Sequence, residues 1–231
     1  MNQDTTSEPR QFFSPWRFWG GMIGVIIGIL ALLVVAGRLI DKRRPVGQLP
    51  VYSRIEGDLV GINRNGQEVR LSTLRGKVFT CAYLYTVCPH GCAAVVGQMM
   101  KLQRAHGART DFHQVSITVA PEHDTPAFLN TYAEGIGLQP RDPWWLMTGE
   151  QKRLWSFMDT QLKLAPAKPI PLDERLNPLD LYQHDLRIVL IDRQGRVRGY
   201  YEVFHSESEI AQLMSEKLQR DVITLLDHPE F

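Results

Sequence analysis

The chain has 231 residues, enough for one well-packed domain and an additional segment, because single domains cluster near about 100–150 residues. Its 26 Lys and Arg nearly balance its 25 Asp and Glu, and the excess of positive charge lies before residue 45. The remaining chain is slightly acidic, which argues against a nucleic-acid partner, since a nucleic-acid groove neutralises phosphates with Lys and Arg.

An apolar run dominates the N-terminal part. Residues 18–37, "FWGGMIGVIIGILALLVVAG", contain no charged side chain; aromatic residues stand at their start and basic residues follow their end. A helix of about 20 apolar residues crosses the ~30 Å hydrocarbon core of a bilayer. We therefore predict an N-terminal tail over 1–17, a single transmembrane anchor over 18–40 and a linker over 41–50.

Two alternatives concern this segment. A cleaved signal peptide competes with an anchor, but its apolar core is usually only ~7–15 residues, and "VVAGRL" is a poor small-residue cleavage site. A plain count for the positive-inside rule places the C-terminal part in the cytoplasm, because Arg10 and Arg17 precede the run whereas four basic residues follow it. Long domains translocate largely regardless of charge, and the chemistry below favours the extracytoplasmic side.

Residues 51–231 predict one α/β domain. The pair Asn65 and Gly66 lies in "DLVGINRNGQEVRL" and predicts a tight hairpin, because both residues tolerate positive φ. A buried strand is predicted over 77–85 and a helix from about 91 to 105, followed by a strand in "DFHQVSITVA".

The next segments carry clear start and stop signals. "DTPAFLNTYAEGIG" predicts a helix with Asp124 or Thr125 as the N-cap and Pro126 at the first position. A strand in "WWLMTG", a helix in "EQKRLWSFMDTQL", a long proline-rich loop over 165–183, a hairpin in "LRIVLIDRQGRVRGYYEV" and an amphipathic helix follow. This order predicts a thioredoxin-like fold with an N-terminal β-hairpin and insertions.

Two of the three cysteines lie where the first buried strand passes into a helix. Cys88 ends the strand and Cys92 lies near the helix start, where free N–H groups stabilise a thiolate. A four-residue offset in a helix brings two side chains about 5–6 Å apart, close enough to bind one metal ion or, with adjustment, to form a disulfide. Pro89 stiffens the turn and Gly91 permits an unusual φ. A structural disulfide or two small buried residues remain alternatives, since a lone C-x-x-x-C is a weak motif.

A third ligand is needed if this pair is to hold a metal well, and histidine is the expected supplier. The candidates are His90, His106, His113, His123, His184, His205 and His228. We favour His184, because it ends the long loop immediately before a strand, and a long loop in a compact domain is often functional. Others, such as His106 and His113, are expected to be solvated. Cys81 lies within the strand and is expected to be a buried core thiol.

Four stretches occur in order: "LRGKVFTCAYLYTVCPHGC", "VSITVAPEHDTPAFLNTYAEGIG", "WWLMTGEQKRLW" and "HDLRIVLIDRQGRV". In this combination residues 51–231 resemble the SCO/SenC family, thioredoxin-like copper-binding proteins that assist cytochrome c oxidase assembly. The resemblance implies that Cys88, Cys92 and His184 bind copper, as Cu(I) or Cu(II). It also implies a single-pass anchor in the bacterial inner (cytoplasmic) membrane, with the domain on the periplasmic or extracytoplasmic side.

Four neighbours of these residues depart from the family pattern. Ala120 stands where the family usually has Asp, Ala93 where it often has Pro, and His90 where an acidic residue is frequent. Asp185 follows the histidine where Ser or Thr is common; it could orient a ligand or cap the following turn. We expect such changes to alter copper affinity and redox behaviour.

Two functions fit these residues. Two thiolates and one imidazole suit Cu(I), although zinc accepts the same ligands. We predict a metallochaperone that delivers copper to the copper-bearing subunit of cytochrome c oxidase or to another cuproprotein. The alternative is a thiol-disulfide oxidoreductase that reduces a copper-accepting partner, with Cys88 as the attacking and Cys92 as the resolving thiol. Removing His184 should disable only the chaperone.

Overall fold

The computed structural model describes residues 15–43 and 49–230. The chain divides into two units between residues 48 and 49. In the first unit one helix, α1 (Pro15–Arg43), is described, with exposed side chains at Trp16 and over residues 19–35.

The transmembrane part of the fold prediction is wrong. In the stretches 15–43 and 49–230, no helix combines the length and the apolar character that crossing a bilayer requires. The tail and the linker predicted around this helix lie largely outside the described residues.

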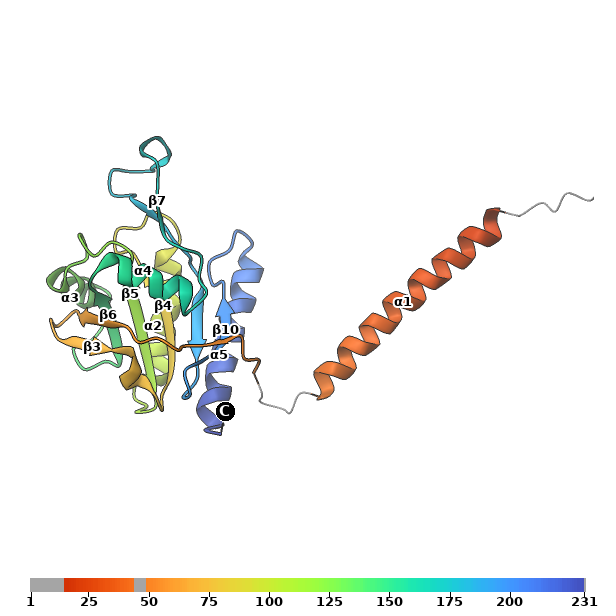
Figure 1. The fold of residues 1–231 in the computed structure, drawn as a ribbon, viewed down its shortest axis with the longest axis horizontal. Coiled ribbons are helices and arrows are strands. Elements are labelled where there is room, and N and C mark those ends of the chain that lie inside the picture. Colours follow the sequence, from red (N-terminus) through yellow and green to blue (C-terminus); the bar gives the residue numbers. More distant parts are fainter. Residues whose placement is uncertain (1–14, 44–48, 231) are drawn as a thin grey trace, which may run out of the picture. The chain divides into compact units, whose positions relative to one another are not determined.

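The second unit is built on an eight-stranded sheet with the strand order β1-β10-β9-β4-β5-β6-β2-β3. The strands are β1 (Ser53–Arg54), β2 (Val60–Asn63), β3 (Glu68–Arg70), β4 (Val78–Leu84), β5 (Phe112–Thr118), β6 (Trp144–Thr148), β9 (Ile188–Ile191) and β10 (Arg196–Tyr201). The helices are α2 (Cys92–His106), α3 (Pro126–Gly135), α4 (Gln151–Thr160) and α5 (Ser208–Asp227), with 3-10 turns at Leu71–Leu74 and Leu172–Glu174. Figure 1 shows their arrangement.

The sheet has the predicted mixture of directions. β4, β5 and β6 are parallel, and α2 and α3 make the crossovers between them, as parallel neighbours require. β9 and β10 form the predicted antiparallel hairpin, and β9 pairs antiparallel with β4. The α/β order read from the sequence is therefore confirmed.

Local turn chemistry also matches the sequence. The β2–β3 hairpin turns at Gly66, whose φ of 80° is accessible to glycine and whose N–H donates to the Asn63 carbonyl at 2.8 Å. α3 begins at Pro126, and its N-cap is Thr125, whose side-chain oxygen accepts from the Phe128 N–H at 3.3 Å. These features confirm the hairpin and the start of this helix.

Three very short strands were not predicted. β1 pairs with β10 at one edge of the sheet, and β7 (Lys168–Pro169) pairs with β8 (Tyr182–Gln183) inside the loop predicted as irregular. Each of the three has two residues, too few to show a period of two in the sequence.

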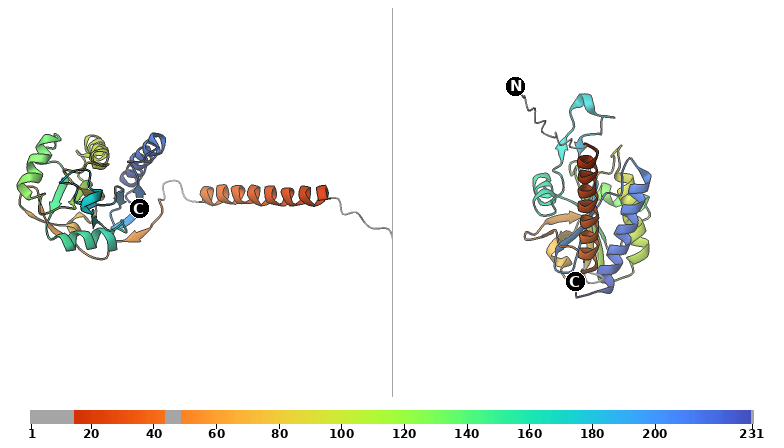
Figure 2. Two further views of the ribbon diagram at one scale, coloured as in Figure 1. Left: turned by 90° about the horizontal axis from the view of Figure 1, so that it is seen from above. Right: turned by 90° about the vertical axis from the view of Figure 1, so that its right-hand side faces the viewer.

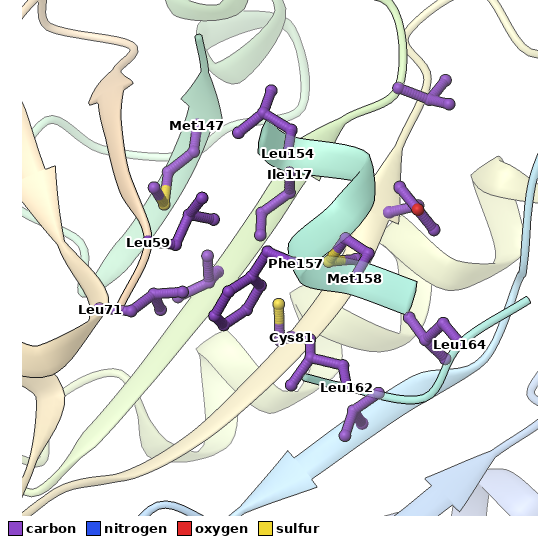
Figure 3. Packing of buried hydrophobic residues seen from close by; sticks show 14 of the residues in the cluster. Leu59, Leu71, Cys81, Ile117, Met147, Leu154, Phe157, Met158, Leu162 and Leu164 are labelled. Atoms are coloured by element: carbon purple, nitrogen blue, oxygen red, sulfur yellow. The ribbon is translucent and has the colours of Figure 1, made fainter. Parts of the chain in front are cut away.

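The core has two layers, one on each face of the sheet. α2, α3 and α5 cover one face and α4 covers the other (Figure 2, left). Neighbouring residues of β4 therefore point to opposite layers: Ala82 packs under the three helices, whereas Cys81 packs under α4 beside Phe157, Met158 and Leu162 (Figure 3). Cys81 has no exposed surface, so its prediction as a core thiol is confirmed.

The pairing of β4 with β9 decides where the predicted site lies. Phe79 is opposite Ile191, and Cys81 is opposite Val189. Because the two strands run in opposite directions, the end of β4 and the beginning of β9 meet at one edge of the sheet. Cys88 follows β4, and His184 precedes β9.

Candidate metal centre

The cysteine turn joins the end of β4 to the start of α2. The Cys88 N–H donates to the Tyr85 carbonyl at 3.1 Å, and Cys92 is the first residue of α2. Gly91 is the N-cap of α2 with φ −111°, a value open to any residue, so it does not supply an unusual φ as expected. A Cβ there would instead collide with the ring of Phe204 and with Leu186.

His184 points at this turn from the other side. Its Nε2 lies 3.1 Å from Cys92 Sγ, and its Nδ1 lies 2.9 Å from the Asp185 carbonyl oxygen. Because a carbonyl oxygen only accepts, Nδ1 carries the proton, and in the neutral ring the Nε2 lone pair faces the sulfur. The rings of Tyr83 and Tyr85 flank the imidazole, at centroid distances of 5.6 and 6.3 Å.

The structure thus brings together the three residues singled out in the sequence. One ligand atom from each of Cys88, Cys92 and His184 lies within 4.8 Å of the others. Among residues 15–43 and 49–230, no other group of three His, Cys, Asp or Glu side chains is close enough to share an ion. Cys92 is buried, whereas Cys88 and His184 are half-buried, so the cluster is reachable from one side.

The two thiols have opposite acidities. The pKa of Cys88 is lowered to about 4, first by the side-chain hydrogen bond with Cys92 and then by the side chain of His184 and the backbone N–H groups of His90 and Cys92, while burial opposes this shift. The pKa of Cys92 is raised, first by this hydrogen bond to Cys88 and then by burial. At neutral pH the reduced pair therefore holds a thiolate on Cys88 and a thiol on Cys92.

The remaining histidines lie outside this cluster. His123 Nδ1 contacts Asp124 Oδ1 at 2.9 Å, His205 accepts from the Glu207 N–H at 3.0 Å, and His228 contacts Glu230. His90 lies in the cysteine turn but faces Asp180, with its Nε2 3.0 Å from Oδ1. None of these rings belongs to the Cys88, Cys92 and His184 group.

The expectation that His113 is solvated is wrong. Only 6% of the residue is exposed, its ring lies 4.5 Å from the Trp145 ring, and neither ring nitrogen has a hydrogen-bond partner among the described residues. β5 is a central parallel strand, buried on both faces, so it offers no solvent-exposed face for such a side chain. His106 lies at the end of α2, half-buried against Phe112.

Asp185 caps the turn after the histidine. Its carboxylate accepts from the Arg187 N–H at 2.9 Å and from the Ala165 N–H at 2.8 Å, and it pairs with the Arg187 guanidinium. These bonds hold the backbone whose carbonyl orients His184. Ala120 is fully buried in the α4 layer, and Ala93 is exposed near the start of α2.

Sequence reasoning missed two carboxylates that join the segments around the site. Asp124, expected only as a possible N-cap, is buried and accepts from the hydroxyls of Thr86 and Thr118. Asp180 is also fully buried. No sequence pattern marks the hydrogen bonds of Asp124 or the contact of Asp180 with His90. The segments that these contacts join lie far apart in the chain or in an irregular loop.

A cavity of about 400 Å³ opens beside the cluster. Its lining residues are Cys88, His90, Ile170, Glu174, Tyr182, Gln183, His184, Leu186 and Phe204. Cys88 and His184 are therefore accessible from this cavity, whereas Cys92 lies behind them.

Comparison with known proteins places the chain in a family. The SCO1/SenC family model matches residues 49–219, which is most of the chain. The chain belongs to the SCO1/SenC family. Among relatives of this SCO1/SenC protein, the SCO2-like protein RP587 of Rickettsia prowazekii is 26% identical over 196 residues, covering 83% of this chain and 92% of the relative. The SCO1 protein homolog of Bacillus subtilis is 29% identical over 122 residues, covering 52% and 63%.

Solved structures share the thioredoxin-like α/β fold of the SCO1/SenC protein. A SCO1/SenC family lipoprotein from Bacillus anthracis matches with a TM-score of 0.63 and 22% identity, over 76% of this chain and 97% of that chain. ScoI of Bradyrhizobium japonicum, solved with copper bound, matches with a TM-score of 0.55 and 24% identity, over 70% and 98%. BsSco, described as having a disulfide switch and as a member of the Sco family of cytochrome c oxidase assembly proteins, gives 0.60 and 24%, over 77% and 97%.

Proposed function

We propose that this SCO1/SenC protein binds copper through Cys88, Cys92 and His184 and delivers it to the copper-bearing subunit of cytochrome c oxidase or to another cuproprotein. The observation that carries the proposal is the convergence of two sulfur atoms and one imidazole nitrogen within 4.8 Å. The copper bound to the Bradyrhizobium relative, and the assembly role named for BsSco, support the choice of metal and partner.

The donor set fits copper. Cys88 supplies a thiolate without further deprotonation, Cys92 releases one proton on binding, and the lone pair of His184 Nε2 already faces the sulfur atoms. Two soft sulfur donors and one imidazole suit Cu(I), and a fourth donor entering from the cavity would suit Cu(II). Zinc remains the competitor, so the test below includes it.

Delivery follows from the unequal exposure of the ligands. Cys88 and His184 line the cavity, so an incoming thiolate or imidazole of the partner reaches them before the buried Cys92. Stepwise replacement of one ligand at a time keeps the copper coordinated throughout the transfer. Cys92 would therefore be the last ligand to leave.

The decisive experiment is an anaerobic Cu(I) titration of the reduced protein against a competing chelator, with Zn²⁺ in a parallel titration. The wild-type protein should bind one Cu(I), and Cys88→Ser, Cys92→Ser and His184→Ala should each weaken binding. His205→Ala is the matched control, because that ring accepts a hydrogen bond from the Glu207 N–H and does not belong to the ligand cluster. Undiminished binding in all three ligand variants would reject the site.

A thiol-disulfide oxidoreductase is the second candidate, favoured by the opposite acidities of the thiols. The Cys88 thiolate would attack a partner disulfide and form a mixed disulfide. Cys92 would then attack the Cys88 sulfur, giving a Cys88–Cys92 disulfide and two reduced partner thiols, with its proton passing to the leaving sulfur. Reduction that persists in His184→Ala while copper delivery is lost would separate the two activities.

We further propose that the domain works outside the cytoplasm, where such a pair can cycle between dithiol and disulfide. An enzyme reporter that is active only outside the cytoplasm, fused after Phe231, should be active in living cells. A silent reporter on a full-length, stable fusion would contradict this location.

A further inference from the structure

The long loop that carries the site histidine is tied directly to the cysteine turn. His90 Nε2 lies 3.0 Å from Asp180 Oδ1 and 3.1 Å from Oδ2. His90 lies midway between the two cysteines, and Asp180 lies four residues before His184. One side-chain pair thus connects the two segments that supply the sulfur and nitrogen atoms.

Asp180 depends on this contact. Its side chain has no exposed surface, whereas that of His90 is 42% exposed. Besides His90, the carboxylate accepts from the Leu176 N–H at 3.1 Å, within the same loop. A buried carboxylate that loses a hydrogen-bond donor pays its desolvation cost without compensation, so it tends to move toward water.

The backbone around Asp180 is held from the other side by β4. The hydroxyl of Tyr85 donates to the Leu179 carbonyl and accepts from the Leu181 N–H at 3.2 Å. Residues 179–181 therefore lie between the end of β4 and the cysteine turn. β8 follows at once and leads into His184, so a shift of this segment would carry the imidazole with it.

The pair is suited to histidine at position 90. An acidic side chain at position 90 would meet the Asp180 carboxylate with like charge. His90 instead offers a ring N–H to the same oxygen atoms.

We propose that His90 and Asp180 form a latch that positions His184 against the cysteines and slows the escape of bound copper. His90 and Asp180 are positioning residues, because neither belongs to the ligand cluster. The proposal rests on the proposed copper site for its effect on the metal, but the latch itself is a property of the metal-free chain. Opening the latch loosens residues 176–184 and, with them, the nitrogen ligand first.

A graded series at position 90 tests the latch. His90→Gln keeps an N–H donor of similar reach and should behave like the wild type; His90→Ala removes the donor; His90→Asp adds a like charge and should have the largest effect. Because His90 is partly exposed, these variants are expected to fold even where Asp180→Ala does not. The matched controls are Asp173→Ala, an exposed acid of the same loop, and His205→Ala.

Two measurements are made on each protein. In the reduced, metal-free state, amide hydrogen exchange over residues 176–184 should be faster in His90→Ala and His90→Asp than in the wild type, His90→Gln and the controls. In the Cu(I)-loaded state, transfer of copper to a chelator should be about tenfold faster in His90→Ala, the lower end of the usual cost of losing a group that orients a ligand. The Cu(II) EPR spectrum should also change with the displaced nitrogen ligand.

The outcomes separate the latch from the copper site. Unchanged exchange and copper release in both His90→Ala and His90→Asp would overturn the latch and leave the copper proposal standing. If amide exchange and copper release were accelerated equally in His90→Gln and His90→Ala, the latch would also be overturned, because the side-chain N–H donor would then be irrelevant. If the wild type failed to bind copper, the proposed function would fail, and faster exchange over 176–184 in the variants would still support the positioning role.

Discussion

Cys88 and Cys92 differ in charge although they lie four residues apart. The hydrogen bond between them gives the negative charge to Cys88, which faces the cavity, and leaves the proton on Cys92, which is buried. An attacking thiol must be both ionised and accessible. The residue that a partner meets first is therefore the reactive one.

We expect this difference to appear in alkylation of the reduced, metal-free protein. Since the pKa of Cys88 is lowered to about 4, its rate should stay near its plateau down to about pH 5, whereas a free thiol loses reactivity below about pH 8.5. Cys92 and the buried Cys81 should remain unmodified in the folded state. Mass spectrometry of proteolytic fragments identifies the modified cysteine.

Cys92→Ala is the informative partner variant. It removes the hydrogen-bond donor of Cys92, which is the largest cause of the low pKa, so the pKa of Cys88 should rise. The alkylation profile should then shift to higher pH. An unshifted profile would mean that His184 and the backbone N–H groups alone stabilise the thiolate.

The site residues were predictable to different degrees. Cys88 and Cys92 stood out because they mark a strand-to-helix junction, and His184 because it ends a long loop before a strand. Asp180 and Tyr85 were missed, since their contacts depend on the path of an irregular loop that no periodicity describes. The residue-level chemistry was thus accessible, and the connections that orient it were not.

At the level of elements, the start of α2 is fixed from outside the helix. The residue Gly91 lies beneath Phe204, which follows β10, and beneath Leu186, which precedes β9. Side chains that flank the final hairpin therefore pack against the turn that carries the cysteines. Glycine is needed there for close packing, which the sequence alone did not distinguish from a need for positive φ.

We expect Gly91→Ala to lower the free energy of unfolding by about 1–3 kcal/mol, the usual cost of overpacking a well-packed site. Gly91→Ala combined with Phe204→Ala should recover part of this loss, because the colliding ring is removed. Urea denaturation of the reduced protein measures both.

The matched control lies in the same helix. A Cβ at Gly97 meets nothing within 4 Å, so Gly97→Ala should be neutral or stabilise the protein by up to about 1 kcal/mol through helix propensity. Equal losses at Gly91 and Gly97 would show that the contact with Phe204 has no special cost.

Elements were predictable where they were long. The buried strands β4 and β5 and the helices α3 and α5 have enough residues to show their periodicity or their capping signals. The ribbon of β7 and β8 has two residues on each side and depends on contacts made by the folded loop. The apolar run of α1 shows the opposite limit, because composition alone suggested a membrane span that the described residues do not support.

At the scale of the whole molecule, the buried His113 makes the free energy of unfolding depend on pH. Burial, followed by the positive charge of Lys77, lowers its pKa to about 3, from an unfolded value near 6.5. A histidine with a lowered folded pKa stabilises the fold fully above the unfolded pKa, and this contribution is lost as pH falls from 6.5 toward 3. The fold should therefore weaken in mild acid before most carboxylates are protonated.

His113→Phe keeps a ring against Trp145 but removes the basic nitrogens. Its free energy of unfolding should fall less steeply between pH 6.5 and 4, by up to about 1.4 kcal/mol per pH unit relative to the wild type. Urea titrations across this range measure the difference. Parallel curves for the wild type and His113→Phe would contradict the assignment.

The antiparallel pairing of β4 with β9 fixes the distance between the sulfur ligands and the imidazole. Each residue adds about 3.3 Å along a strand, so inserting or deleting one residue between His184 and Ile188 would displace the imidazole by more than a bond length and turn it to the other face. Length changes at the exposed tip of the loop, residues 171–174, would be absorbed by the loop. During evolution the chain can therefore gain or lose residues at this tip, while the spacing from Asp180 to Ile188 is inherited unchanged.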